Sequence, residues 1–174
     1  MFRIALAVAV CLPLTARADL THVGVSGVVG GGVTEQSSET GVLWSARVTL
    51  GSRLPLALEL GYLGSSTHDP HGGTLDADTL DATVRYALLP GFFVSPYAFA
   101  GLSWQHVDLS GARMTPSLSL QTVDDAAALP VGVGISIRPS GSVIVDLRGT
   151  YRASRATIAD IDAWEATAGV GIEL

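Results

Sequence analysis

The sequence predicts an all-β protein, an eight-stranded antiparallel up-and-down transmembrane β-barrel preceded by a cleaved signal peptide. Apolar and polar residues alternate in short segments along most of the 174 residues, as in strands with one apolar face. Charged residues make up only 15% of the chain, against roughly 25% in an average soluble domain. No run reaches the ~18 consecutive apolar residues of a membrane helix, so this composition favours strands that cross a membrane.

Residues 1–18 are predicted to be the signal peptide, and residues 19–174 the barrel domain. Arg3 gives a basic start, residues 4–14 are apolar, and Ala16-Arg17-Ala18 forms a small-x-small cleavage site. The alternatives are a first helix of the fold and a lipid anchor at Cys11, the single cysteine. Cleavage would leave eight of the ten basic residues, all arginines, against sixteen acidic ones. This acidic balance argues against nucleic-acid binding.

Eight segments carry the alternating pattern, with turn-forming residues between them. We expect strands at 20–33, 41–51, 55–64, 74–88, 97–108, 129–137, 143–153 and 164–174. The first is the least regular, because the glycines at 30–32 indicate fraying or a bulge. In the fifth, Gly101, Ser103 and Gln105 define the polar face. Most segments have the ~9–11 residues that a tilted strand needs to cross a bilayer.

The last of these segments shows the strictest period of two. Val170, Ile172 and Leu174 share an apolar face, whereas Gly171 and Glu173 lie on the other face. An unpaired strand edge leaves its N–H and C=O groups open, so we expect this strand to close the barrel against the first one.

Connections between the expected strands alternate in length. Those at 52–54, 89–96 and 139–142 are short, whereas those at 34–40, 65–73, 109–126 and 154–163 are longer and polar. Such alternation puts all the short turns on one rim. Barrels of the outer membrane have short periplasmic turns and longer outside loops, so we expect that location in a Gram-negative-type cell, with both chain ends periplasmic.

The polar faces of the expected strands suit the interior of a narrow barrel. They are rich in Gly, Ser and Thr, which are small enough for a crowded lumen. Their charges balance, five arginines against five acids, as is expected where buried charges must pair. The predicted lumen ion-pair residues are Arg47, Glu59, Asp81, Arg85, Arg138, Asp146, Arg148, Arg152, Glu165 and Glu173.

Aromatic residues on the apolar faces indicate that these faces meet lipid. Several lie near strand ends, where amphipathic rings prefer the membrane interface. The predicted interfacial aromatics are Trp44, Tyr62, Tyr86, Trp104, Tyr151 and Trp164. Two alternatives are aromatics in an ordinary core and a secreted lipocalin-like barrel, whose apolar residues point inward.

Two stretches carry a resemblance to a known family. The chain resembles the small eight-stranded outer-membrane barrels of the OmpA/OmpX/OmpW kind in Pro96-Tyr97-Ala98-Phe99-Ala100-Gly101-Leu102, which is similar to a recurrent strand start. Gly169-Val170-Gly171-Ile172-Glu173-Leu174 looks like the terminal signal that the barrel-assembly machinery reads. The resemblance implies the barrel architecture and allows several roles, since the family includes adhesins, stability proteins and minor channels.

No catalytic, metal or cofactor site is predicted. His68-Asp69-Pro70-His71 is the one tight group of ligand-type residues, and we interpret it as a polar loop because the proline limits convergence. Gly30-Gly31-Gly32 lacks the lysine and helix of a phosphate loop. No histidine lies near a serine and an acid in a recognisable motif, so we do not expect an enzyme.

Acidic residues gather in or beside the longer connections. They are Glu35, Glu39, Asp69, Asp76, Asp78, Asp108, Asp124, Asp125, Asp160 and Asp162, opposed by Arg113 and Arg155. Solubility at an exposed rim is the simplest interpretation. The alternative is that these acids attract divalent cations that bridge to anionic lipid headgroups, or meet a basic partner.

Three function hypotheses follow. The first is a structural or surface-interaction role in the cell envelope, with a lumen plugged by side chains. The second is a narrow channel or port for small apolar solutes, and the third is the secreted ligand-binding barrel. The expected partners are outer-membrane lipid, the barrel-assembly machinery during insertion, and divalent cations at the acidic loops.

Overall fold

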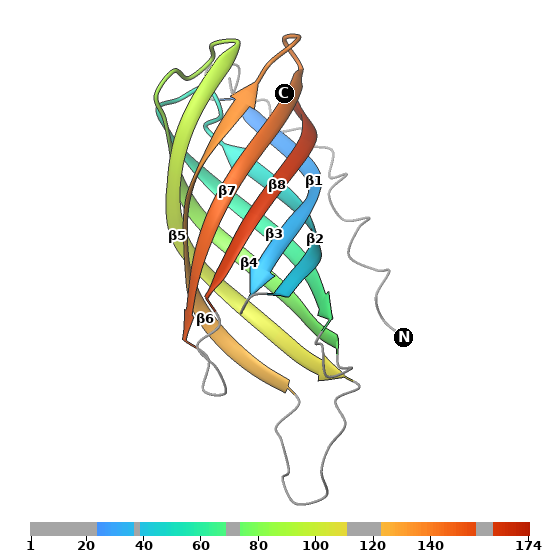
Figure 1. Cartoon of the computed structure of the whole chain (residues 1–174). Coiled ribbons are helices and arrows are strands. Elements are labelled where there is room, and N and C mark those ends of the chain that lie inside the picture. Colours follow the sequence, from blue (N-terminus) through green and yellow to red (C-terminus); the bar gives the residue numbers. More distant parts are fainter. Residues whose placement is uncertain (1–23, 37–38, 69–73, 111–122, 156–161) are drawn as a thin grey trace, which may run out of the picture.

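The computed structural model describes residues 24–36, 39–68, 74–110, 123–155 and 162–174, and all regular structure in these ranges is strand. The strands are β1 (Val25–Gln36), β2 (Glu39–Leu50), β3 (Leu56–His68), β4 (Thr74–Ala87), β5 (Val94–Ser110), β6 (Val123–Ile137), β7 (Val143–Arg155) and β8 (Ala163–Glu173). They pair antiparallel in sequence order, and β8 pairs with β1 (Figure 1). The predicted closed eight-stranded barrel is therefore confirmed.

Within the described ranges, no helix is long and apolar enough to span a membrane. The predicted signal peptide lies outside these ranges, as does most of the His68-Asp69-Pro70-His71 segment.

Several strands extend further than the alternating pattern predicted. β6 begins at Val123 rather than at Leu129, and β5 begins at Val94. The ladder between β1 and β2 continues to the pair Gln36↔Glu39, so only residues 37–38 connect them. The prediction of a longer connection at 34–40 is wrong. Polar side chains at the end of a barrel face water on both sides of the sheet, so they end the alternation without ending the backbone pairing.

The two ends of the barrel differ. One end, here called the turn rim, carries the connections 51–55, 88–93 and 138–142, the start of β1 and the end of β8 (Figure 1, top). The other end, the loop rim, carries the connections 37–38, 69–73, 111–122 and 156–162. The expected length contrast holds for 111–122 and 156–162, and it fails at 37–38 and at 69–73, which is no longer than the turn-rim connection 51–55.

The apolar face of each strand points outward. Leu102, Val133 and Leu174 are each about two-thirds exposed at the barrel surface, whereas Arg47, Asp146 and other polar-face residues are buried. The predicted facing is confirmed, and the lipocalin-like alternative is wrong, because that barrel would bury these large aliphatic side chains.

Two aromatic residues of β5 point inward, on the same parity as Gly101, Ser103 and Gln105. Tyr97 and Phe99 are buried and pack with Ala87 in the lumen. Their partners on β6 are Gly134 and Gly132, where an added Cβ would collide with the aromatic rings. The rings therefore fill the space that the glycines leave inside the barrel.

Glycines also permit the close approach of β1 and β8 at the closing seam. A Cβ added at Gly171 would overlap the backbone carbonyl oxygen of Gly27, and one at Gly32 would overlap that of Ala166. Backbone atoms cannot move aside as the end of a flexible side chain can. Closure therefore depends on glycine at these inward positions.

We expect Gly171→Ala to lower the free energy of unfolding by about 1–3 kcal/mol, because the added methyl group overpacks the seam. Gly149→Ala is the matched control, since Gly149 has nothing within 4 Å of an added Cβ. A urea titration with heat-modifiable gel mobility as the readout measures both variants. Equal unfolding midpoints for the two would contradict a backbone constraint at the seam.

Candidate functional site: the polar lumen

The lumen is filled by layers of paired charges. One layer centres on Asp146 of β7, which is 1% exposed. The Asp146 carboxylate accepts hydrogen bonds from Arg47 Nη2 (2.9 Å), from the Tyr97 hydroxyl (2.9 and 3.0 Å) and from the Ser136 hydroxyl (2.8 Å). Four strands, β2, β5, β6 and β7, are joined through this one carboxylate, which is stabilised because charged hydrogen bonds replace its lost hydration.

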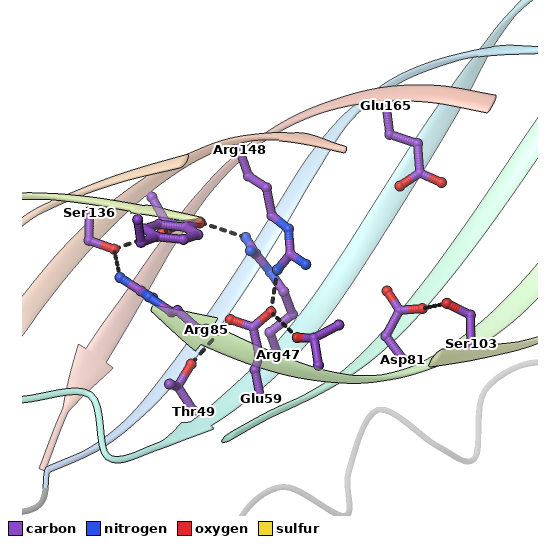
Figure 2. A network of polar contacts seen from close by, with 12 residues as sticks. Arg47, Thr49, Glu59, Asp81, Arg85, Ser103, Ser136, Arg148 and Glu165 are labelled. Carbon is purple, nitrogen blue, oxygen red and sulfur yellow. Dashed lines mark hydrogen bonds and ion pairs between the residues drawn. The ribbon is translucent and has the colours of Figure 1, made fainter. Parts of the chain in front are cut away.

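A second layer pairs Arg148 with Glu59. Arg148 projects from β7 across the lumen and forms an ion pair with Glu59 of β3 (Figure 2). Glu59 also accepts hydrogen bonds from Thr49 (3.3 Å) and Thr83 (3.4 Å). The Arg148 guanidinium lies 3.4 Å from the centre of the Phe99 ring, in a cation–π contact. The inward Phe99 thus contributes to holding the charge that blocks the lumen.

A third layer, toward the loop rim, places one arginine between two acids. Arg152 is 1% exposed and donates to Asp81 (2.8 and 3.1 Å) and to Glu165 (2.8 and 3.2 Å). Ser103 donates to Asp81 at 2.5 Å. This layer spans β4, β5, β7 and β8, and the two-to-one ratio gives it a net negative charge.

A fourth layer closes the turn rim through Arg138. Its side chain donates to Glu173 of β8 (3.1 Å), to the carbonyl oxygen of Ser52 (3.1 Å) and to that of Phe92 (3.4 Å). Glu173 in turn accepts from the Ser52 hydroxyl (2.5 Å). Arg138 lies at the end of β6, so one guanidinium ties together the connections 51–55, 88–93 and 138–142 and strand β8.

Arg85 is the one predicted lumen residue that makes no ion pair with the described carboxylates. It donates to the Ser136 hydroxyl at 2.7 Å (Figure 2). Its guanidinium lies 3.6 Å from the centre of the Tyr97 ring. The five-to-five balance of the sequence is therefore not five separate pairs. Arg152 takes two acids, and Arg85 is stabilised by a hydroxyl and a ring.

The lumen changes character toward the loop rim, where its walls combine apolar and polar side chains. A recess there is lined by Leu43, Leu63, Leu75, Val107 and Ala163, together with polar residues that include Glu165. Its enclosed space of about 20 Å³ has room for roughly one water molecule. Leu43 and Leu63 are buried on the polar parity of their strands, so alternation alone did not identify this recess.

The predicted interfacial aromatics all lie on the outer surface. Trp44 packs on Tyr62 with ring centres 5.0 Å apart, and Tyr151 packs on Trp164 at 4.9 Å. The tyrosine hydroxyls donate to acids further toward the loop rim, Tyr62 to Asp78 (2.9 Å) and Tyr151 to Asp162 (2.6 Å). Trp104 lies in the same band on β5, whereas Tyr86 lies nearer the turn rim. The predicted assembly-strand residues Val170, Ile172 and Leu174 are also exposed outward.

Beyond this aromatic band, the outer face of β4, β5 and β6 is acidic. Asp76 pairs in register with Asp108, and Asp78 pairs with His106, which pairs with Asp125. His106 and Asp125 form a 2.8 Å hydrogen bond outside the membrane-crossing part of β5, and this bond raises the pKa of the His106 imidazole.

Among the described residues, no group of three ligand-type side chains could hold a metal ion. Of the other predicted acids, Glu35 is exposed on β1, whereas Asp69 and Asp160 lie outside the described residues.

The layered ion pairs predict a specific stability pattern. We expect Arg152→Met to lower the free energy of unfolding by about 3–5 kcal/mol, because it leaves Asp81 and Glu165 buried without a cation. Adding Asp81→Asn and Glu165→Gln should recover most of that loss. Urea titration of the refolded barrel measures both variants.

Arg85→Met is the matched control, because removing Arg85 leaves no carboxylate within ion-pair distance uncompensated among the described residues. It should cost clearly less than Arg152→Met. A larger cost for Arg85→Met would show that burial alone, and not pairing, sets the stability of the lumen.

The architecture and the chain's sequence can be compared with known proteins. Among curated proteins, no sequence matches the chain. Solved structures match in fold, including Neisserial surface protein A (NspA), at a TM-score of 0.63 and 21% identity over 86% of this chain and 95% of that one. Ail of Yersinia pestis matches at a TM-score of 0.62 and 11% identity, over 88% of this chain and 99% of that one. The N-terminal β-barrel domain of Pseudomonas aeruginosa OprF matches at a TM-score of 0.59 and 16% identity, over 86% of this chain and 97% of that one.

A family model described as the outer membrane protein beta-barrel domain matches residues 2–173, which is nearly the whole chain. That match agrees with the closed eight-stranded barrel, the outward apolar faces and the polar lumen. The chain therefore belongs to the outer membrane protein β-barrel family and is a protein of the Gram-negative outer membrane.

Proposed function

We propose that this protein acts in the cell envelope through its outer surfaces, as a structural or surface-interaction barrel, and does not conduct solutes through its lumen. The observation that supports this most directly is the set of four charge layers across the interior. Arg47, Arg138, Arg148 and Arg152 each hold a carboxylate, and the inward Tyr97 and Phe99 fill space between them. An eight-stranded barrel is only wide enough for such side chains, so little room is left for a path.

In this proposal the turn rim faces the periplasm and the loop rim faces outward. We further infer that residues 1–18 are removed on export, leaving 19–174 as the barrel, and that the assembly machinery reads the outward Val170, Ile172 and Leu174 of β8. The role is non-enzymatic. In the described lumen, each carboxylate already accepts a hydrogen bond from an arginine, so none is available as a general base.

A second candidate function is a port for small apolar solutes, favoured by the leucine and valine side chains in the recess near the loop rim. Leu43, Leu63 and Val107 would contact such a solute, and the Arg152 layer would lie below it. Passage would then require the charge layers to part.

Single-channel recording in planar bilayers separates the two candidates. We expect no steady conductance from the wild-type barrel, because the layers block the lumen. The double variant Arg148→Ser/Glu59→Ser removes both partners of one layer without leaving a lone charge, and it should conduct more often and for longer. Steady wild-type conductance equal to that of the double variant would exclude the plugged barrel and favour the port.

The acidic loop-rim surface suggests what the outer face attracts. Ail has been crystallised with the heparin analogue sucrose octasulfate, a polyanion. This chain exposes Asp78, Asp125 and Asp162 beside its aromatic band, so like charges disfavour a polyanion here. We propose instead that divalent cations gather between these acids and the phosphate groups of neighbouring lipids. The acids are spread along strands, so the attraction would be diffuse and weak.

We expect calorimetry of the refolded barrel to show calcium uptake at millimolar concentration that is lost at high salt, because diffuse attraction is screened. The variant Asp78→Asn/Asp125→Asn should reduce the uptake. Ser142→Asn is the control, because Ser142 is exposed at the opposite rim, away from these acids. Uptake that is absent, or that is unaffected by the rim variant, would remove the cation proposal while leaving the plugged barrel untouched.

A further inference from the structure

The connection between β4 and β5 is apolar where it leaves the barrel. It reads Leu88-Leu89-Pro90-Gly91-Phe92-Phe93, and no charged residue occurs between Leu88 and Pro96. Phe92 and Phe93 are each 63% exposed, and Leu88 and Leu89 are also exposed. A connection that projects into water normally carries polar residues, so this composition requires an apolar environment at the turn rim.

The other two connections of the turn rim are less apolar than this one: 138–142 is polar, and 51–55 is intermediate. Residues 138–142 are polar, with exposed Ser140 and Ser142. Residues 51–55 carry Arg53, but Leu54 is 41% exposed, and the Pro55 carbonyl accepts a 2.7 Å hydrogen bond from Ala87 beside the β4–β5 connection. The exposed apolar residues on this side of the rim form what we call the turn patch: Leu54, Leu88, Leu89, Phe92, Phe93 and Val94.

The backbone of the turn patch is held in one conformation. Phe92 N donates to Leu89 O (3.4 Å), Leu88 N donates to Pro96 O (2.9 Å), and Gly91 provides the positive φ of 78° that the reversal needs. From the connection after β6, Arg138 donates to Phe93 O through its backbone N (2.8 Å) and to Phe92 O through its guanidinium (3.4 Å). The polar backbone atoms are thus partly satisfied from within, and the side chains are presented outward without a large ordering cost.

The patch is continuous with the lipid-facing surface. Leu88 follows Tyr86 on the outer face of β4, and Val94 begins the outer face of β5, which runs apolar as far as Trp104. Ten residues of tilted strand correspond to about 25 Å, the full height of an apolar barrel band. The band on β7, from Val143 to Ala153, has the same number of outward positions. The turn patch therefore makes the apolar surface taller on the β4–β5 side of the barrel.

We propose that the turn patch inserts into the acyl chains of the phospholipid leaflet at the turn rim, and that it anchors the barrel there on its β4–β5 side. This rests on the outer-membrane residence of the family and not on the plugged lumen. Acyl chains match the patch because it offers large apolar groups and no charge to orient a polar partner. A band that is taller on one side is accommodated by tilt, so the barrel leans with this side deeper at the turn rim.

Spin labels test the proposal in the full chain carrying Cys11→Ser. Single labels are placed at Leu89→Cys in the patch, at Ser140→Cys in the polar connection of the same rim, and at Leu102→Cys on the lipid face. The barrel is refolded into vesicles of phosphatidylethanolamine and phosphatidylglycerol, and collision rates with oxygen and with a water-soluble nickel chelate are measured. We expect the Leu89 site to match the Leu102 site, with nickel collisions several-fold fewer than at Ser140.

A second variant links this result to the two rings. Phe92→Ser/Phe93→Ser in the Leu89→Cys chain should raise nickel collisions at Leu89 toward the Ser140 value, while the same double change leaves the Leu102 site unaltered. Equal nickel access at Leu89 and Ser140 in the unmodified patch would overturn insertion. Protection that is found only in native outer membranes would assign the patch to a protein partner, and spin–spin coupling between Leu89 labels would assign it to a second copy; both would overturn the lipid proposal. None of these outcomes bears on lumen conductance.

Discussion

Pairing of every strand edge is the constraint on which this structure depends. In hydrocarbon, an unpaired backbone N–H or C=O group has no water to bond, so a spanning sheet must close on itself. Here the last ladder, β1 with β8, runs from Ser26↔Glu173 to Gln36↔Ala163. The closeness of the two backbones at this seam explains the inward glycines of both strands, where a Cβ would meet the neighbouring chain.

Closure with eight strands then determines what the interior can hold. The lumen is narrow, so charged side chains inside it lose water and must find partners across a short distance. Asp146, Glu59, Asp81 and Glu173 do so through arginines from other strands, and these contacts cross the barrel between segments as much as 99 residues apart. The ion pairs both stabilise the closed form and occupy the path that an ion would take, which is why structure and non-conducting behaviour are linked in the proposed function.

The outer surface is divided by the membrane into three zones with different chemistry. Acids lie toward the loop rim, apolar side chains and rings form the band, and the turn rim is polar at 138–142 but apolar at 88–93. Arg138 connects the turn rim to the lumen, because its side chain donates hydrogen bonds both to Glu173 of β8 and to the carbonyl oxygen of Phe92. The turn patch is therefore held by the residue that also ties β8 to the rim.

The sequence by itself determined the fold class, the number of strands and the facing of nearly every residue, because a period of two is a local property of each segment. It also identified the set of lumen charges, of which Arg47, Arg138, Arg148 and Arg152 form ion pairs. Only the tertiary structure decided the partners: Arg152 pairs with two acids, Arg85 contacts Tyr97 and Ser136, and the rings of Tyr97 and Phe99 lie over Gly134 and Gly132. Those outcomes depend on strand tilt and on which residues meet across the lumen, and neither is encoded in the alternation of a single strand.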